Sequence, residues 1–390
     1  MKTTAGLTIA LTVILATNVF GGSLRVELDG SGDYVGIQEA VNAAASGDTI
    51  LIGPGRWDQM YTYTIPAGGW TDQVIVAVDN KDLTLVGSGQ GVTIIGPEVA
   101  PPFGNPGPIA IVGGTDHDLT VKSMTIENMR NGIYEWGKTL QVEDVHIRDC
   151  YLGSSPWATH GAEYVGCLFE RCYERGIAAG SRASGMIIRN CEFIGWAQKH
   201  ISLQGVEDIL IEHCDFYTGN ISVQFEGSSS YGVVQDCVFH SGYGPHIVAT
   251  TYSHMTLNRC RMFGGIEQLH LVDYSVVTGE ENEFLGTNLE GGGFGTIVAQ
   301  MASLDLHDSH IYKGNAEYTV RFYDYPFFPN MGQHLENNYW GTSDSDSIAA
   351  WIYNEDDDSS LNIQTFIEPF YDHPIPNEPA SMSDLKKMFR

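Results

Sequence analysis

The chain has 390 residues, 43% hydrophobic and 17% charged, a balance that excludes a disordered chain and provides for one large domain or two ordinary ones. Its 20 Lys and Arg residues against 48 Asp and Glu residues give a formal net charge of −28, which disfavours nucleic acid and anionic membranes as partners. The 45 glycines favour a turn-rich, all-β fold over a helical bundle.

Residues 1–22 have the pattern of a secretory signal peptide. Lys2 precedes the stretch Leu7–Ala16, which contains only apolar residues and threonines, and small residues follow at 21–23. The stretch is shorter than the roughly 20 residues that a membrane-spanning helix needs. We therefore predict an exported protein (periplasmic, secreted or at the cell surface) without membrane insertion after signal removal. A retained N-terminal anchor is the alternative.

A short amphipathic helix is expected near the N-terminus. Apolar residues recur at i, i+3, i+4 and i+7, at Ile37, Ala40, Val41 and Ala44. Gly47 stands where the C-terminal cap of this helix belongs, and Thr49–Ile52 has the pattern of a first strand. Because the open end of a solenoid exposes its core and unpaired strand edges, we interpret the helix as a lid.

Five of the seven cysteines are evenly spaced through the middle of the chain. They lie 24, 23, 23 and 23 residues apart, at Cys167, Cys191, Cys214, Cys237 and Cys260. A large apolar residue follows each by two positions, at Phe169, Phe193, Phe216, Phe239 and Met262. The frame continues at Met124, Val145, Asn282, Ser309 and Asn338. A second short strand signal recurs in each period, beginning at Ile177, Ile201, Val223, Ile247, Leu269, Ile297 and Val320.

A period of this length with short alternating strands predicts a solenoid. Residues at i and i+2 share one side of a strand, so equivalent residues of successive coils stack about 4.8 Å apart inside the coil. We predict an all-β, right-handed parallel β-helix of about twelve coils over residues 23–372, with a short N-terminal capping helix and a C-terminal tail at 373–390.

The cysteines of such a ladder are predicted to be structural, because a buried thiol packs as a small apolar group. Seven is an odd number and no CxxC spacing of a zinc site occurs. Export permits disulfides, and Cys150 and Cys172, which lie outside the main ladder, are the predicted pair.

Two segments resemble known proteins of this architecture. Asp29–Ala44, with Gly47–Ile50 and Gly53–Gly55, resembles the opening of bacterial right-handed β-helix repeat proteins and of pectin methylesterases. Asn337–Gly341 is similar to the closing motif of many such repeat proteins, including relatives of the NosD-type copper-maturation proteins. The resemblance implies the pectin-lyase-like superfold over nearly all the mature chain. Because one superfold hosts many functions, it implies no particular reaction.

Catalytic motifs of enzymes with this fold have no match. The later motifs of pectin methylesterases and the Gly-His-Gly and Arg-Ile-Lys signatures of polygalacturonases are absent. Asp116-His-Asp118 lacks the proline of the alginate epimerase motif Asp-Pro-His-Asp, and we interpret it as a turn before Leu119–Val121. We predict no metal site and no cofactor; Ca²⁺ is an alternative that no motif supports.

The second strand of each coil is predicted to present an outer surface. Residues at −1, +1 and +3 from its first inward residue point outward. They include Tyr134, Trp136, His200, Ser202, Gln204, Gln224, Glu226, His246, Val248, His270, Gln300, Arg321 and Tyr323. Aromatic, amide and imidazole groups on a flat sheet suit stacking on, and hydrogen bonding to, sugar rings. The predicted ligand contacts are Trp136, Gln204, Gln224, Arg321 and Tyr323; an ordinary polar sheet face is the alternative.

Glu226, His246 and His270 fall on consecutive coils. We predict them on one face within about 10 Å along the axis, two strand spacings. Glu226 beside a histidine could act as a proton-transfer pair. A surface hydrogen bond without catalytic duty is the alternative.

Two function classes follow. The first is a monomeric, exported protein that binds or processes an extracellular polysaccharide or cell-surface glycan, with lyase and hydrolase activity both left open. The second is a non-catalytic structural or adhesive solenoid. Long turns beside the outer surface would wall a groove and favour the first class. The candidates are Met60–Gln73, Pro97–Pro108 and Tyr323–Gln333.

Overall fold

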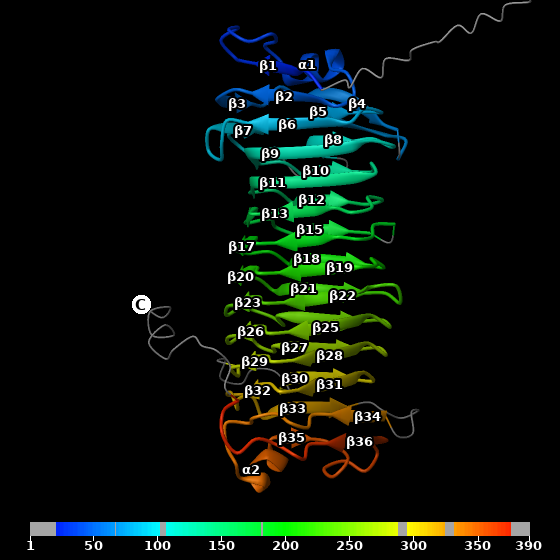
Figure 1. Ribbon diagram of the computed structural model, residues 1–390, viewed down its shortest axis with the longest axis vertical. Coiled ribbons are helices and arrows are strands. Elements are labelled where there is room, and N and C mark those ends of the chain that lie inside the picture. The colour runs from blue at the N-terminus through cyan, green and yellow to red at the C-terminus, as the bar shows by residue number, and fades with distance from the viewer. Residues whose placement is uncertain are drawn as a thin grey trace, which may run out of the picture.

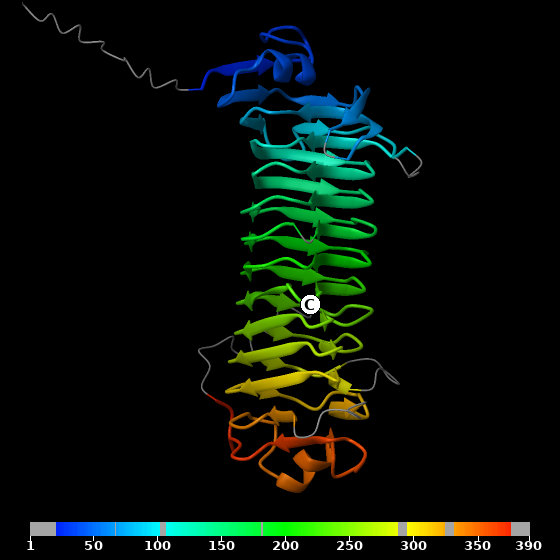
Figure 2. The ribbon, with the colours of Figure 1, turned by 90° about the vertical axis from the view of Figure 1, so that its right-hand side faces the viewer.

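The computed structural model describes residues 21–66, 68–101, 107–180, 182–287, 295–323 and 331–375. Strands in this part of the chain stack coil upon coil along one axis (Figures 1 and 2). Most of the predicted signal, most of the predicted tail, and residues 102–106 and 324–330 of two predicted groove walls lie outside the described residues. Within the described ranges, no helix is both long enough and apolar enough to cross a bilayer.

Two sheets form the coils. A 13-stranded sheet, sheet B, contains β4 (Tyr61–Ile65), β5 (Trp70–Val78), β8 (Ile109–Gly113), β10 (Asn131–Glu135), β12 (Leu152–Pro156), β15 (Arg175–Ala179), β18 (Lys199–Gln204), β21 (Ile221–Glu226), β24 (Ile247–Thr250), β27 (Leu269–Val272), β30 (Gly295–Gln300), β33 (Tyr318–Tyr323) and β35 (Ile352–Tyr353). Its strands from β5 onward, one per coil, are parallel and confirm the predicted repeat of about twelve coils.

A 23-stranded sheet, sheet A, supplies the other sides of each coil. It contains β1 (Ser23–Val26), β2 (Asp48–Ile52), β3 (Gly55–Trp57), β6 (Leu83–Gly87), β7 (Thr93–Ile95), β9 (Asp118–Glu127), β11 (Thr139–Arg148), β13 (Glu163–Val165), β14 (Leu168–Glu170), β16 (Ile187–Arg189), β17 (Glu192–Ile194), β19 (Ile209–Glu212), β20 (Asp215–Tyr217), β22 (Tyr231–Gln235), β23 (Val238–Phe239), β25 (His254–Asn258), β26 (Arg261–Met262), β28 (Val276–Glu280), β29 (Glu283–Phe284), β31 (Ser303–His307), β32 (His310–Ile311), β34 (Met331–His334) and β36 (Ile363–Phe366).

Sheet A bends at a corner immediately before each residue of the cysteine ladder. The residue at the bend adopts a left-handed backbone, with φ of 52° at Asn190 and 54° at His213 and Asp236. Each cysteine after the bend points into the coil and is at most 2% exposed. Beyond Cys260 the ladder continues with polar side chains that form hydrogen bonds with the backbone of the neighbouring coil. Asn282 Oδ1 accepts from the Cys260 amide at 3.0 Å.

The interior is a stack of like residues. The rings of Phe169, Phe193, Phe216 and Phe239 lie 4.8 to 4.9 Å apart and nearly parallel. All seven cysteines are buried and free. The predicted Cys150–Cys172 disulfide is therefore wrong: the Cys150 thiol donates to Arg148 O at 3.3 Å and the Cys172 thiol to Ile147 O at 3.7 Å.

A helix closes each end of the coil stack (Figure 1). The N-terminal helix α1 (Ile37–Ala43) buries Ile37, Ala40 and Val41 as predicted. It ends at its C-cap Ala44, three residues before Gly47, whose φ of 90° serves the turn into β2 instead. The second helix, α2 (Ser345–Ala350), lies at the C-terminal end of the coil stack and buries Ile348.

Part of the Met60–Gln73 insertion forms a hairpin of β4 and β5, the antiparallel pair at the end of sheet B. Its Ile65, together with Val74 of β5, packs in a second, smaller core on the outer side of sheet B, with Ile109, Val112 and Tyr134. The predicted groove wall is therefore a hairpin that covers the outer face of the first coils.

Candidate functional site

The outer face of sheet B consists of two columns of outward side chains, which the strand register defines. The first outer column runs through Ala77, Val112, Tyr134, Ser155, Ala178, Ser202, Gln224, Val248, His270, Val298, Arg321 and Tyr353. The second outer column, two residues further along each strand, runs through Asp79, Gly114, Trp136, Trp157, Gly180, Gln204, Glu226, Thr250, Val272, Gln300 and Tyr323. Unlike the interior columns, both change residue type at nearly every coil.

Aromatic rings gather where the hairpin meets these columns. This aromatic cluster comprises Trp70, Tyr134, Trp136 and Trp157. The Trp70 ring lies 5.9 Å from Tyr134 and 6.4 Å from Trp136 in edge-on geometry. Trp136 and Trp157, one coil apart, are stacked at 6.4 Å with an angle of 18° between their planes. Both indoles are half-buried, so the pair forms an aromatic surface that is still open to solvent.

Glycines on either side of the indole pair let neighbouring side chains lie flat against the sheet. A Cβ at Gly180 would lie 2.3 Å from the Trp157 ring, so this indole covers the Gly180 backbone. A Cβ at Gly114 would lie 2.0 Å from Asp79 Oδ1, so the Asp79 carboxyl covers Gly114, beside Trp136 in the second outer column. Asp79, Trp136 and Trp157 therefore form one continuous line along the axis.

Asp79 is the acidic group of this line. The Tyr63 hydroxyl of β4 donates to its Oδ2, and burial raises the pKa of the Asp79 carboxyl above its ordinary value. A carboxyl that keeps its proton at higher pH than usual, beside an aromatic surface, is suited to proton donation. Among the described carboxyls of this face, Asp79 is therefore the strongest acid–base candidate.

Behind this line, an acid and a histidine are buried inside the coil. Glu135 Oε1 lies 3.3 Å from His117 Nε2, and both side chains are fully buried. Glu135 fits there because Gly113 has no side chain. A Cβ at this position would lie only 1.7 Å from Glu135 Oε2. Burial raises the pKa of Glu135. The predicted turn at Asp116–Asp118 is present, with Asp116 in a left-handed backbone at φ 63°, but its histidine belongs to the interior.

Most of the residues that the sequence predicts to contact a ligand lie on the outer face of sheet B. Gln224, His270 and Arg321 are in the first outer column, and Trp136, Gln204, Glu226 and Tyr323 are in the second. Trp136 and Tyr323 are eight coils apart, about 38 Å at the usual strand spacing. Only a long, extended ligand could contact both. Their roles in binding stay predictions.

The prediction that His246 and His200 point outward from sheet B is wrong. Both rings point into the coil, with their centroids 5.8 Å from the rings of Phe239 and Phe193, respectively. His246 Nε2 also lies 3.1 Å from Phe263 O. Strict alternation begins only at the residue after each histidine, because at this corner the side chain turns toward the phenylalanine column. Burial lowers the pKa of both imidazoles to about 4.

The predicted proton-transfer pair at Glu226 is absent from the described residues. His270 Nδ1 instead pairs with Glu267 Oε2 on its own coil. The register places His270 two coils from Glu226 and in the other outer column. The expectation that Glu226, His246 and His270 share one face therefore holds only for Glu226 and His270.

Sequence reasoning missed Trp157, Trp70, Asp79, His117 and Glu135. Trp157 could have been found, because it follows Trp136 by 21 residues, one coil period. The others had no such signal: Trp70 lies in a non-repeating hairpin, and Glu135 is an exception to the expectation that inward residues are apolar.

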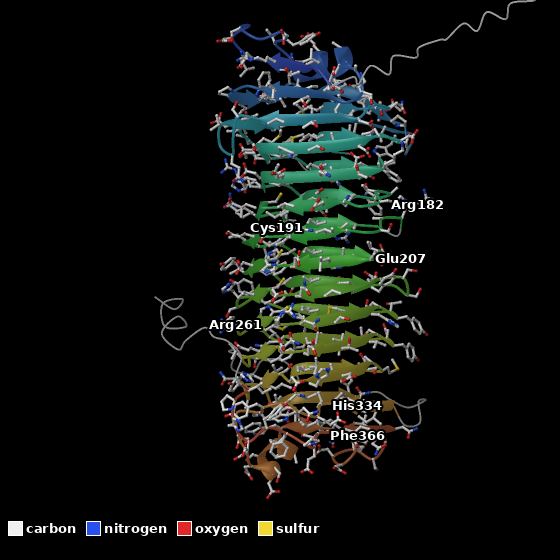
Figure 3. The ribbon with its side chains drawn as sticks, in the orientation of Figure 1. Arg182, Cys191, Glu207, Arg261, His334 and Phe366 are labelled. Carbon is white, nitrogen blue, oxygen red and sulfur yellow. The ribbon has the colours of Figure 1, made fainter. Side chains whose placement is uncertain are left out.

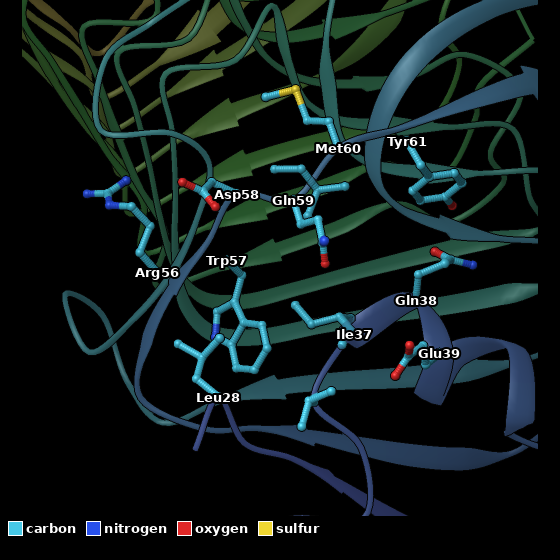
Figure 4. Close-up of a pocket in the computed structure, with 13 residues that line it drawn as sticks. Leu28, Ile37, Gln38, Glu39, Arg56, Trp57, Asp58, Gln59, Met60 and Tyr61 are labelled. Atoms are coloured by element: carbon cyan, nitrogen blue, oxygen red, sulfur yellow. The ribbon is translucent and has the colours of Figure 1, made fainter. Parts of the chain in front are cut away.

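A hollow with a volume of about 560 Å³ lies at the N-terminal cap. Figure 4 shows Trp57, Ile37 and Leu28 on one side of it and Gln38 and Glu39 of α1 nearby. The Gln38 amide is already bonded to the Ala77 backbone, at 2.8 and 3.1 Å. We interpret this hollow as the seam between the lid and the first coil. In the described ranges, no group of three or more His, Cys, Asp or Glu side chains could hold a metal ion.

Comparison with known proteins addresses the fold. The model of the family described as "Right handed beta helix region" matches residues 157–324, less than half of the chain. This chain is a right-handed parallel β-helix. The fold predicted from the repeats is thereby confirmed. No curated protein matches the sequence.

Several solved structures are similar to this β-helix at low identity. The catalytic unit of a thermostable GH87 α-1,3-glucanase from Streptomyces thermodiastaticus is 13% identical, over 93% of this chain and 70% of its own, with a TM-score of 0.49. Carrot pectin methylesterase is 12% identical, over 89% and 88%, with a TM-score of 0.34. A mannuronan C-5 epimerase module from Azotobacter vinelandii is 10% identical, over 86% and 93%, with a TM-score of 0.34. Similarities this low say nothing of what this chain binds.

Proposed function

We propose that this β-helix binds a polysaccharide along the second outer column of sheet B, with sugar rings stacked on Trp136 and Trp157. The observation that carries the proposal is the indole pair: two half-buried rings, nearly parallel and one coil apart. Flat aromatic surfaces suit the apolar faces of sugar rings, and an indole supplies much contact area at a small cost in conformational entropy.

Polar atoms along the same face lack partners. Ser155 Oγ, Gln224 Oε1 and the Nε1 atoms of Trp136 and Trp157 are buried and have no hydrogen-bond partner among the described residues. Buried polar groups are nearly always satisfied. A turn of the Gln224 and tryptophan side chains would bring these atoms to the hydroxyl groups of a sugar chain, which both donate and accept hydrogen bonds.

The shape of the face suits a linear ligand. The second outer column runs straight along the axis from Trp136 to Glu226, four coils or about 19 Å. The hairpin of β4 and β5 closes its N-terminal end through Trp70. A chain of several sugar rings lying along the axis would contact the indole pair, then Gln204 and Glu226.

The test is a glycan array followed by affinity measurements on variants. We expect Trp136→Ala and Trp157→Ala each to weaken binding of the glycan identified on the array by about tenfold or more, since tenfold is 1.4 kcal/mol. Tyr243→Ala, which removes an aromatic ring 64% exposed elsewhere, is the matched control. Binding of no glycan at all would favour the structural or adhesive solenoid, and unchanged affinity in both tryptophan variants would remove this face from consideration.

We also propose that the protein is exported, so that the binding face meets an extracellular polysaccharide. We further propose that it acts as a monomer. The basis for export is the pattern of Lys2 and Leu7–Ala16. N-terminal sequencing of the secreted protein, combined with its mass in solution, checks both points. A chain that stays in the cytoplasm with Met1 intact contradicts the first.

A further inference from the structure

A second hollow of about 490 Å³ lies at the corner where the chain leaves sheet B. It is lined by residues that directly follow the second outer column, Ala158 after Trp157 and Gly205 after Gln204, and by His160, Arg182, Ser184 and Glu207. Figure 3 shows Arg182 and Glu207 at the same edge of the solenoid. A ligand on the indole pair would therefore reach this hollow with its side groups.

Inside the hollow, a serine and a histidine are joined by a hydrogen bond. His160 Nδ1 lies 2.7 Å from Ser184 Oγ. The two residues face each other across adjacent coils, in parallel register with Glu207 on the next coil. A hydroxyl within 2.6–3.2 Å of an imidazole nitrogen is the geometry of an activated nucleophile and its general base.

Arg182 is the positively charged residue that lines the hollow. No carboxylate lies within ion-pair distance of its guanidinium in the part of the chain that the structure describes, although acidic residues outnumber basic ones more than twofold. The amides of Ser184 and Gly185 are already bonded to Thr159 O and Glu207 O, at 3.2 and 2.9 Å. A developing oxyanion beside Ser184 must therefore be stabilised by a side chain, and the fork of N–H donors on Arg182 is suited to that role.

We propose that Ser184, His160 and Arg182 form an ester-hydrolysing site. Ser184 Oγ attacks the carbonyl carbon of an ester while His160 Nδ1 takes its proton, and Arg182 faces the tetrahedral oxyanion. The bond from this carbon to the alcohol oxygen breaks, and His160 returns the proton to the leaving alcohol. Water then attacks the carbonyl carbon of the acyl-Ser184 while His160 Nδ1 takes a proton from it. The bond from this carbon to Ser184 Oγ breaks, His160 gives that proton to Ser184 Oγ, and a carboxylic acid is released.

The substrate class follows from the position of the hollow, and this step rests on the proposed function. A sugar ring stacked on Trp157 has its substituents next to Ala158 and Gly205, on the rim of the hollow. The ester is therefore an acyl group on a sugar hydroxyl, such as an O-acetyl group. The polysaccharide backbone stays on the outer face of sheet B, and the acyl group enters the hollow.

The experiment uses the full chain with p-nitrophenyl acetate, acetylated xylan and a fluorophosphonate probe. We expect hydrolysis of the ester by the unaltered protein, and a fluorophosphonate adduct on the peptide that contains Ser184. Ser184→Ala should abolish both, and His160→Ala should lower the rate by about 10²-fold or more, the usual contribution of a general base. Ser229→Ala, which lines the same hollow, is the matched control and should act like the unaltered protein.

The inference is overturned by a folded, unaltered protein without ester hydrolysis and without an adduct, or by a Ser184→Ala variant that keeps full activity. Binding of xylan to Trp157→Ala is measured in parallel. Glycan binding that depends on Trp157, without ester hydrolysis, removes this inference and leaves the proposed function standing. Hydrolysis of p-nitrophenyl acetate that depends on Ser184, without glycan binding, supports the hydrolytic site and removes the polysaccharide proposal.

Discussion

The inside of the coil and the outer face of sheet B follow opposite rules. Inside, one residue type repeats from coil to coil, as in the phenylalanine column with rings 4.8 to 4.9 Å apart. Outside, a single column contains Asp79, Trp136, Trp157, Gln204 and Glu226, with a glycine after Asp79 and another after Trp157. Repetition suits packing, since equal side chains stack in register. A column that changes at nearly every coil offers distinct groups to a ligand, and the candidate site lies there.

The largest effect is expected where the interior column is broken. Phe216→Ala removes a fully buried ring that lies between Phe193 and Phe239. The free energy of unfolding should fall by about 3–5 kcal/mol, the usual cost of truncating a buried phenylalanine. Chemical denaturation measures it, with Tyr243→Ala as the exposed control. A loss below 1 kcal/mol would mean that the rings are not stacked in the core.

The buried histidines make the stability of the interior depend on pH. The imidazole of His246 has a pKa of about 4 in the folded chain against about 6.5 when unfolded. The unfolded state binds more protons between these values, so this contribution to stability is complete above pH 6.5 and is lost as the pH falls toward 4. The loss is about 3 kcal/mol at most.

Urea denaturation at pH 7 and pH 4.5 checks this expectation. His246→Gln should lose less stability between the two pH values than the unaltered protein does. His254→Gln, at an exposed histidine, is the control and should keep the full difference. An unchanged pH dependence in His246→Gln would place this ring in solvent.

A smaller change should disturb the outer face and leave the interior intact. Gly180→Ala places a Cβ 2.3 Å from the present position of the Trp157 ring, which must move. Glycan affinity should fall by about tenfold, or 1.4 kcal/mol, while the unfolding free energy changes less than in Phe216→Ala. Gly36→Ala, whose Cβ would meet nothing closer than 3.5 Å, is the control. Equal affinity in both variants would show that the position of Trp157 does not matter.

The difference between the two regions also explains what the sequence could reveal. The cysteine and phenylalanine ladders repeat at the coil period, so the fold, the coil number and the inward columns were predictable. The direction of His246 was not, because it depends on the backbone at a corner, where alternation fails. Trp157 carried the period and could have been recognised beside Trp136.

The rest of the candidate site depends on contacts between segments without a repeat. Trp70 reaches Trp136 only because the hairpin of β4 and β5 folds over sheet B. The Glu135–His117 pair exists because Gly113 leaves room inside the coil. Ser184 meets His160 across 24 residues, one coil period, at a position where the residue type differs between the two coils. Such pairings become visible only once the register is known.

Hydroxyl-radical footprinting with and without the glycan identified on the array tests the central claim most directly. Mass spectrometry of the tryptophan peptides reports how much each indole is oxidised. We predict that the glycan lowers oxidation of Trp136 and Trp157, while Trp196, which is 45% exposed on another part of the surface, is oxidised equally in both samples. Protection of Trp196 alone, or equal oxidation of Trp136 and Trp157 with and without the glycan, would contradict binding on the outer face of sheet B.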